Sequence, residues 1–284
     1  MRSGRHLKRR AYGSFIAAVL AVNCLAVSNT PVRAEGLIRI AEQYGISYLP
    51  LQVLRVQEGI EKKGKELGLD IKVEWTKLSG GSTVNDAVLS GAIDIGGAGI
   101  GPLLTIWDRT HGSANVKGIA ALGSLPNFLI SRNPNVKKLE DLTKADKIAV
   151  PTVAVSVQGR TLQIAAEKAF GSGQHARLDE LTVSLPHPDA TAALIAGGSE
   201  INAHVSVPPY QYQVLKEQPA AHKVFSSYDV LGGPASQVSV FATEKWRADN
   251  PKTYAVFVAA LKEAEAWIQA NKDAAAEVYI RAEN

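Results

Sequence analysis

The sequence predicts an α/β fold in which two similar lobes face one another across a cleft. Short apolar segments that resemble strands alternate with helical patterns along the chain, which is typical of sheets covered by helices. In addition, AVLSGAIDIGGAGIGP (87–102) resembles ALIAGGSEINAHVSVPP (193–209) in the order of its parts: helix end, glycine, strand, loop and proline. Ligands of open α/β sheets bind beyond the carboxyl ends of the strands, so two such lobes would share one site.

Residues 1–34 have the features of a secretory signal peptide. The basic segment MRSGRHLKRR precedes an apolar run, AYGSFIAAVLAVNCLAV, and VRA ends the segment with small residues where a signal peptidase cleaves. We therefore predict cleavage after Ala34 and a periplasmic location. A membrane anchor is disfavoured, because no later segment approaches the roughly 18 apolar residues that a membrane span needs.

Removal of this segment changes the charge and the cysteine content. It holds six of the 31 Lys and Arg residues and none of the 27 Asp and Glu, so the remaining chain has a net charge of −2 instead of +4. The sequence pI of about 9.0 then gives no support for nucleic-acid binding. The one cysteine, Cys24, is removed as well, so we expect neither a disulfide nor thiol chemistry.

In the first half of the chain, apolar patterns and capping residues define the elements. Strands are predicted at 37–41, 71–75, 92–96, 116–122 and 128–132. Apolar residues at helical spacing predict a helix over 49–67. Ser82 or Thr83 is expected to cap the next helix, with Asp86 completing a capping box. Pro102 suits the first turn of a further helix.

The second half repeats this alternation. Strands are predicted at 147–151 and 181–185. A helix is predicted over 156–170, another begins at Pro188, and a third covers 210–216. The segment after Asn250 is strongly helical, with a break at Asn271 or Lys272.

The motifs exclude several kinds of chemistry. The glycines at 96, 97, 99 and 101 spell G-G-x-G-x-G, which is not the dinucleotide fingerprint, and the chain has no P-loop and no G-x-S-x-G motif. The histidines lack the spacing of a metal pair, so we predict neither a cofactor nor a metal. His187 and His204, at the ends of predicted strands, are each either a hydrogen-bonded structural residue or a ligand contact.

Small residues precede four of the predicted helices. These loops are SGGS at 79–82, GIG at 99–101, SVQG at 156–159 and His187-Pro188. Helix N-termini offer unpaired N–H groups and a positive dipole end, which suit a small anion or a carboxylate. Ordinary capping explains any one of them alone, but four from both lobes favour a shared cleft. Near predicted loops lie four tyrosines that either line this cleft or pack at the lobe surface: Tyr44, Tyr48, Tyr210 and Tyr212.

These residues together resemble a known family. SGGSTVNDAVLSGAIDIGGAGIGP and LPHPDATAALIAG are similar to blocks of the periplasmic substrate-binding proteins of ABC importers, in the nitrate/sulfonate/taurine-binding group. The resemblance covers nearly all of 36–280. It implies a two-lobed type II fold with a ligand cleft and a hinge of two strands, which we place near 123–130 and 228–241. The implied lobes are 35–125 with 235–284, and 126–234.

The resemblance also implies a set of ligand-binding residues. They are Tyr44, Ser79, Gly80, Gly81, Ser82, Gly99, Ile100, Gly101, Ser156, Val157, Gln158, His187, His204, Pro208 and Tyr210. Two features of sulfonate binders are missing: the acid before the proline, where this chain has Gly101, and a W-x-P-like motif, where it has 204–209. The sequence therefore leaves the solute unnamed within the class of small anions and zwitterions.

The implied function is solute capture for transport. A monomer would close its lobes on the solute and deliver it to a membrane permease and its ATPase, without a cofactor and without nucleic acid. Two alternatives stay open: an exported enzyme that uses His187 or His204, and a ligand-sensing subunit of a membrane receptor. Some relatives of this fold make a thiamine pyrimidine precursor with a cysteine-rich motif and iron, and the chain after Ala34 has no cysteine for that chemistry.

Overall fold

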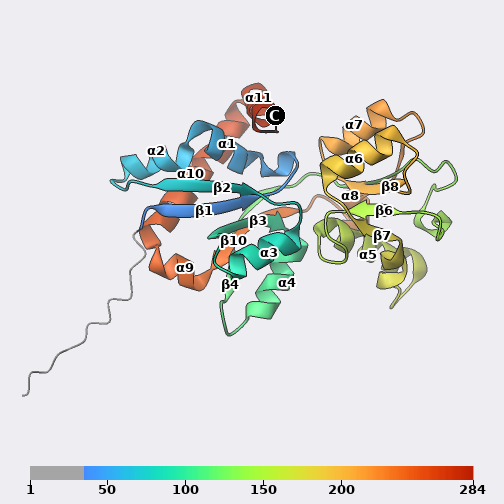
Figure 1. The fold of residues 1–284 in the computed structure, drawn as a ribbon, viewed down its shortest axis with the longest axis horizontal. Helices are drawn as coiled ribbons and strands as arrows, with labels where there is room; N and C mark the ends of the chain where they lie inside the picture. The colour runs from blue at the N-terminus through green and yellow to red at the C-terminus, as the bar shows by residue number, and fades with distance from the viewer. Residues whose placement is uncertain (1–34, 284) are drawn as a thin grey trace, which may run out of the picture. The chain divides into compact units, whose positions relative to one another are not determined.

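The computed structural model describes residues 35–283, which lie in one compact unit, 33–284. Its strands form two five-stranded sheets, with the orders β2-β1-β3-β10-β4 and β7-β6-β8-β5-β9 (Figure 1). This confirms the predicted α/β class. The predicted signal peptide lies outside the described residues. Among the described residues, no helix has the length and apolar character that crossing a membrane requires.

The two sheets share one plan. In the first, β1 pairs parallel with β2 and β3, and β10 runs antiparallel between β3 and β4. In the second, β6 pairs parallel with β7 and β8, and β5 runs antiparallel between β8 and β9. The first sheet comprises β1 Leu37–Glu42, β2 Lys72–Lys77, β3 Ile95–Gly99, β4 Val116–Gly123 and β10 Val238–Thr243. The second comprises β5 Phe128–Ser131, β6 Ile148–Val150, β7 Thr182–Ser184, β8 Ala203–Ser206 and β9 His222–Ser226.

The chain passes from one sheet to the other twice. Residues 124–127 join β4 to β5, and residues 227–237 lead from β9 through α8 (Ser227–Leu231) to β10. The strands of the first sheet thus come from both ends of the chain. The exact lobe boundaries and the hinge stay a prediction.

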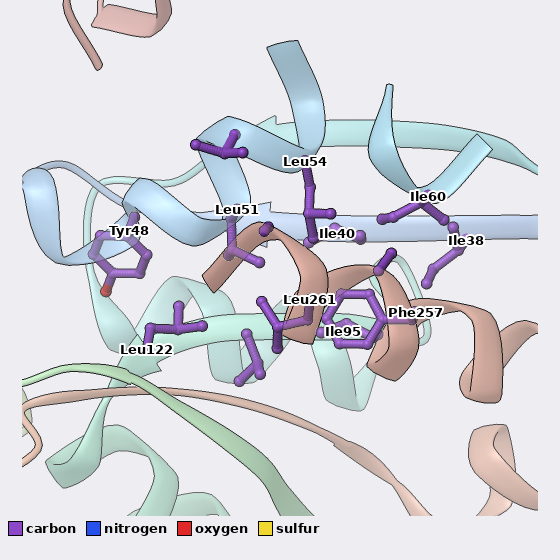
Figure 2. Packing of buried hydrophobic residues seen from close by; sticks show 14 of the residues in the cluster. Ile38, Ile40, Tyr48, Leu51, Leu54, Ile60, Ile95, Leu122, Phe257 and Leu261 are labelled. Carbon is purple, nitrogen blue, oxygen red and sulfur yellow. The ribbon is translucent and has the colours of Figure 1, made fainter. Parts of the chain in front are cut away.

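Helices cover both faces of the first sheet. One face packs against α1 (Leu49–Gln57), α2 (Gly59–Glu66), α10 (Pro251–Ala270) and α11 (Lys272–Glu283). Figure 2 shows Phe257 and Leu261 of α10 among the side chains of Leu54 and Ile95, all of them buried. The other face packs against α3 (Gly81–Leu89) and α4 (Ile100–Thr110), and α9 (Glu244–Asp249) follows β10.

The second sheet is covered in the same way. On one face, α5 (Val157–Phe170) and α8 pack Leu162 and Val230 against strand residues such as Ile148. On the other, α6 (His187–Ala196) and α7 (Tyr210–Glu217) pack Leu194 and Val214 against Ile130. Short 3-10 helices occupy Ile46–Tyr48, Leu139–Asp141 and His175–Leu181.

Two local predictions were wrong. The helix predicted over 49–67 is two helices, because Glu58 adopts a left-handed conformation with φ 53° between α1 and α2. Neither Ser82 nor Thr83 caps α3, since the N-cap is Gly80 and no side-chain cap bond forms. The first residue of the helix, Gly81, packs against α4, because a Cβ on Gly81 would lie 2.1 Å from Cγ of Pro102.

The glycine run belongs to a strand and not to a loop. Gly96 and Gly97 lie in β3, at the centre of the first sheet. A Cβ on Gly96 would lie 2.8 to 2.9 Å from side-chain atoms of Val84, Val88 and Phe241. The absence of side chains therefore lets α3 pack directly on the sheet.

The two similar segments of the sequence have a shared structural role. Asp94, just before β3, accepts hydrogen bonds from the backbone N and Nε of Arg39 in β1, at 2.9 and 3.0 Å. Asn202, just before β8, accepts one from the backbone N of Lys147, next to β6, at 3.0 Å. Its Nδ2 also donates to Asp146 at 2.8 Å. Each side chain thus ties the start of a central strand to the neighbouring parallel strand.

Candidate ligand-binding cleft

Residues from both sheets line one narrow cleft. Its cavity volume is about 30 Å³. Its walls are Gln43, Tyr44, Ser47, Tyr48, Ser79, Gly81, Gly99, Pro102, Asn127, Pro151, Ser156, Val157, Gln158, His187, Val207, Gln237 and Val238. A cleft this narrow suits a small solute.

On the first lobe, the wall is built at the carboxyl ends of parallel strands. Gln43 and Tyr44 follow β1, Ser79 follows β2, and Gly99 ends β3. The Gln43 amide is held in place, because its Nε2 donates to the carbonyl oxygen of Gly97 at 3.2 Å. This is the edge of an α/β sheet at which ligands bind.

On the second lobe, two helix N-termini contribute to the wall. The Ser156 hydroxyl caps α5, accepting from the backbone N of Gly159 at 3.1 Å and donating to the carbonyl oxygen of Thr152 at 2.7 Å. This cap places Gln158 in the first turn of α5, and His187 begins α6. Both helices therefore direct the positive end of their dipole toward the cleft.

The segments that connect the sheets supply two amide side chains. Asn127 precedes β5 and Gln237 precedes β10, and both are buried. Asn127 Nδ2 donates to Gln237 Oε1 at 3.4 Å, and the backbone N of Asn127 donates to the Ser227 hydroxyl at 3.0 Å. The two crossings are thus joined beside the cleft.

A pair of buried histidines belongs to the second wall, in which His187 lines the cleft and His204 lies outside the lining. His187 Nδ1 is 2.9 Å from His204 Nε2, and His187 Nε2 is 3.2 Å from Gln158 Nε2. The Tyr210 ring stacks on His187 with a centroid distance of 5.9 Å. Burial lowers the pKa of His187 to about 3. Burial and the neighbouring His187 hold the pKa of His204 well below its ordinary value, so both rings are neutral at pH 7.

Charged side chains lie outside the cleft lining. None of the described residues that line it is Asp, Glu, Lys or Arg. Two ion pairs involve residues close to Tyr44: Arg55 pairs with Glu42 at 3.0 Å, and Lys77, 5.2 Å from the Tyr44 ring centroid, pairs with Glu283. Burial raises the pKa of the Glu42 carboxyl despite these cations. The groups that the lining offers are therefore neutral side chains and helix N-termini.

The structure divides the predicted site residues into two groups. Those that line the cleft are Tyr44, Ser79, Gly81, Gly99, Ser156, Val157, Gln158 and His187. Those outside the lining, at its border or behind it, are Gly80, Ser82, Ile100, Gly101, His204, Pro208 and Tyr210. Two residues of the second group lie against the other lobe. A Cβ on Gly80 would lie 2.4 Å from Thr152 Oγ1, and one on Gly101 would lie 2.5 Å from the Val155 carbonyl oxygen.

These contacts give the two loop glycines a structural role. Gly80 and Gly101 make room for backbone carbonyl oxygens of the opposite lobe, those of Pro151 and Val155, and their contact with a solute stays a prediction. The Pro208 carbonyl oxygen has a similar role, because it accepts from the backbone N of Ile46 at 3.1 Å. The lobes are thus in direct contact around the cleft.

Several lining residues escaped the sequence analysis. They are Gln43, Ser47, Pro102, Asn127, Pro151, Gln237 and Val238, whereas Tyr48 and Val207, which also line the cleft, were among the predicted positions. Gln43 was within reach, since it lies between a predicted strand and Tyr44. Asn127 and Gln237 lie inside the predicted crossings, where a polar side chain between apolar runs was the available signal.

The family follows from a match over most of this architecture. A model described as the NMT1-like family matches residues 46–281, which include every cleft-lining residue except Gln43 and Tyr44. The chain belongs to the NMT1-like family. No curated protein matches this NMT1-like chain. Among its described residues, no group of three or more His, Cys, Asp or Glu is arranged to hold a metal ion.

Solved structures share the two-lobed fold at low identity. The alkanesulfonate-binding protein SsuA of Xanthomonas axonopodis pv. citri, bound to MOPS, is 17% identical with a TM-score of 0.67, over 88% of this chain and 80% of its own. The periplasmic aliphatic sulphonate-binding protein SsuA of Escherichia coli gives 17% and 0.63, over 88% and 79%. The periplasmic nitrate-binding protein NrtA of Synechocystis PCC 6803 gives 16% and 0.64, over 86% and 65%. The predicted fold and the resemblance to this group are confirmed.

The neutral histidines predict that the free energy of unfolding decreases as the pH is lowered. Because the pKa of His187 is about 3 in the folded protein and 6.5 ordinarily, the unfolded chain binds a proton that the folded one does not. The contribution of these histidines to the free energy of unfolding is therefore fully present above pH 6.5. It decreases toward pH 3 by up to about 1.4 kcal/mol per pH unit for each histidine. Urea unfolding at pH 7, 6 and 5 should show a shallower decrease for His204→Gln than for the unmodified protein. Equal slopes would contradict the assignment.

Proposed function

We propose that the protein is the solute-binding component of an ABC importer, which captures a small anionic or zwitterionic solute between its lobes and delivers it to a permease. The observation that carries this proposal is the cleft itself. It is lined by strand ends of both sheets and by both crossing segments, so a bound solute contacts every part of the fold that closure moves. The relatives with this fold include sulfonate- and nitrate-binding periplasmic proteins.

The chemistry of the walls supports recognition of an acidic group. The first turns of α3, α5 and α6 contribute Gly81, Val157 and His187 to the lining. The first N–H groups of a helix have no partner within the helix, and the dipole favours a negative charge there. A sulfonate, carboxylate or nitrate can thus bind without a cationic side chain.

Closure provides the signal for delivery. A solute that contacts both lobes stabilises the closed arrangement over an open one, and this differential affinity is what shifts the population. We place the protein in the periplasm as a monomer, where its closed form would engage a permease driven by an ATPase.

A binding screen tests the proposal. Thermal shift and calorimetry with nitrate, sulfonates, taurine and small carboxylates should identify a solute that stabilises the protein by about 2.7 kcal/mol at 100 times its Kd. Tyr44→Ala, in the lining, should weaken that binding at least tenfold. Tyr212→Ala is the matched control, because Tyr212 is 53% exposed on α7 and does not line the cleft. A folded, solute-free protein that responds to nothing in the panel would overturn the proposal.

A further inference from the structure

Two glutamine side chains from opposite lobes reach the cleft with their nitrogens already engaged. Gln43 Nε2 donates to the Gly97 carbonyl oxygen at 3.2 Å. Gln158 Nε2 lies 3.2 Å from His187 Nε2. Both side chains line the cleft, with 7% and 6% exposure. The carbonyl oxygen of each has no hydrogen-bond partner among the described residues, so it is the group that each amide offers to a solute.

The histidine pair gives the Gln158 contact a direction. An amide nitrogen only donates, so His187 Nε2 must accept, and the neutral ring then carries its proton on Nδ1. That Nδ1–H donates to His204 Nε2 at 2.9 Å. His204 consequently carries its own proton on Nδ1, a buried atom without a partner in the described chain.

Other buried polar groups belong to the same elements as this histidine pair. Thr191 Oγ1, Ser206 Oγ and both amide atoms of Gln211 are buried and unpartnered within the described residues. They belong to α6, β8 and α7, the elements that hold His187, His204 and Tyr210. The hydroxyl and amide groups can each accept as well as donate, so the direction of the chain of hydrogen bonds depends on the Gln158 contact.

We propose that Gln43 and Gln158 form a subsite for a hydrogen-bond-donating nitrogen of the solute, with His187 and His204 as positioning residues that keep the Gln158 oxygen toward the cleft. The inference rests on the proposed function and deepens it. A bare oxyanion would meet two carbonyl oxygens, one from each lobe, and would gain nothing from them. A zwitterion places its acidic group at the helix N-termini and its amine between the two amides.

Matched solutes test the class. Taurine with ethanesulfonate and β-alanine with propionate differ, within each pair, only in the amine. Calorimetry should give at least tenfold tighter binding of the amine-bearing member in a pair that binds. Equal binding within the pairs, or binding of nitrate alone, would overturn this inference and leave the proposed function intact. Failure of every solute in the screen would instead overturn the proposed function.

Variants test the positioning roles through the affinity ratio within a pair. Gln158→Met keeps the side-chain length without the acceptor, and it should bring the ratio of amine-bearing to amine-free affinity close to one. His204→Leu frees the Gln158 amide to turn and should also reduce the ratio at least threefold. His204→Gln retains an acceptor for His187 Nδ1–H and should preserve it. An unchanged ratio in Gln158→Met, or equal ratios in the two His204 variants, would contradict the assigned roles.

Discussion

Replacement of Asp94 by alanine is expected to lower the free energy of unfolding by about 3 kcal/mol. The Asp94 carboxylate is 5% exposed and accepts hydrogen bonds from the backbone N, Nε and Nη2 of Arg39, the last at 2.6 Å. The Arg39 side chain is itself only 15% exposed. Removal of one partner from a buried ion pair leaves the other charge uncompensated, which costs about 3 to 5 kcal/mol. Urea denaturation of the folded variant measures the loss.

Two control variants make this result specific. Asp94→Asn keeps an acceptor for the Arg39 backbone N and should lose less. Lys72→Ala removes an ion pair with Glu74 in which the side chains are 75% and 46% exposed, and such pairs contribute about 1 kcal/mol or less. If Asp94→Ala were as mild as Lys72→Ala but lost solute binding, Asp94 would act in the cleft and not in the sheet.

Replacement of Gly101 by alanine is expected to weaken solute binding by about 30-fold with little effect on unfolding. Its Cβ would lie 2.5 Å from the Val155 carbonyl oxygen, a backbone atom of the opposite lobe. Overpacking of this kind costs about 2 kcal/mol, and here only the closed arrangement bears it. Each 1.4 kcal/mol lost from the closed form reduces the apparent affinity tenfold. Calorimetry with the tightest-binding solute of the screen measures the change.

A matched glycine replacement provides the control. Gly118→Ala, in β4, brings its Cβ near only one atom, Leu103 Cδ2 at 3.3 Å, which belongs to a flexible side chain of the same lobe. Its affinity should equal that of the unmodified protein. Gly80→Ala, whose Cβ would approach Thr152 Oγ1, should behave like Gly101→Ala. Unchanged affinity in both interlobe variants would show that binding does not require this contact.

Rules that act over a few residues predicted much of the local structure. Ser156 begins α5 through a hydroxyl cap, and Pro188 and Pro251 lie in the first turns of α6 and α10. The same rules failed at α3. Gly80, and not Ser82 or Thr83, precedes this helix, and the close approach of Pro102 requires a glycine at its first residue, Gly81.

The sequence by itself determined the α/β class and the repeated order of strands and helices, and it predicted many of the residues that line the cleft. Those features depend on apolar periodicity and on strand ends, which a linear pattern contains. Only the tertiary structure decided that Asn127 and Gln237 meet beside the cleft, that His187 bonds His204, and that Gly101 contacts the other lobe. Such contacts join residues 17 to 110 positions apart, and they depend on strand order and lobe closure, which no local pattern encodes.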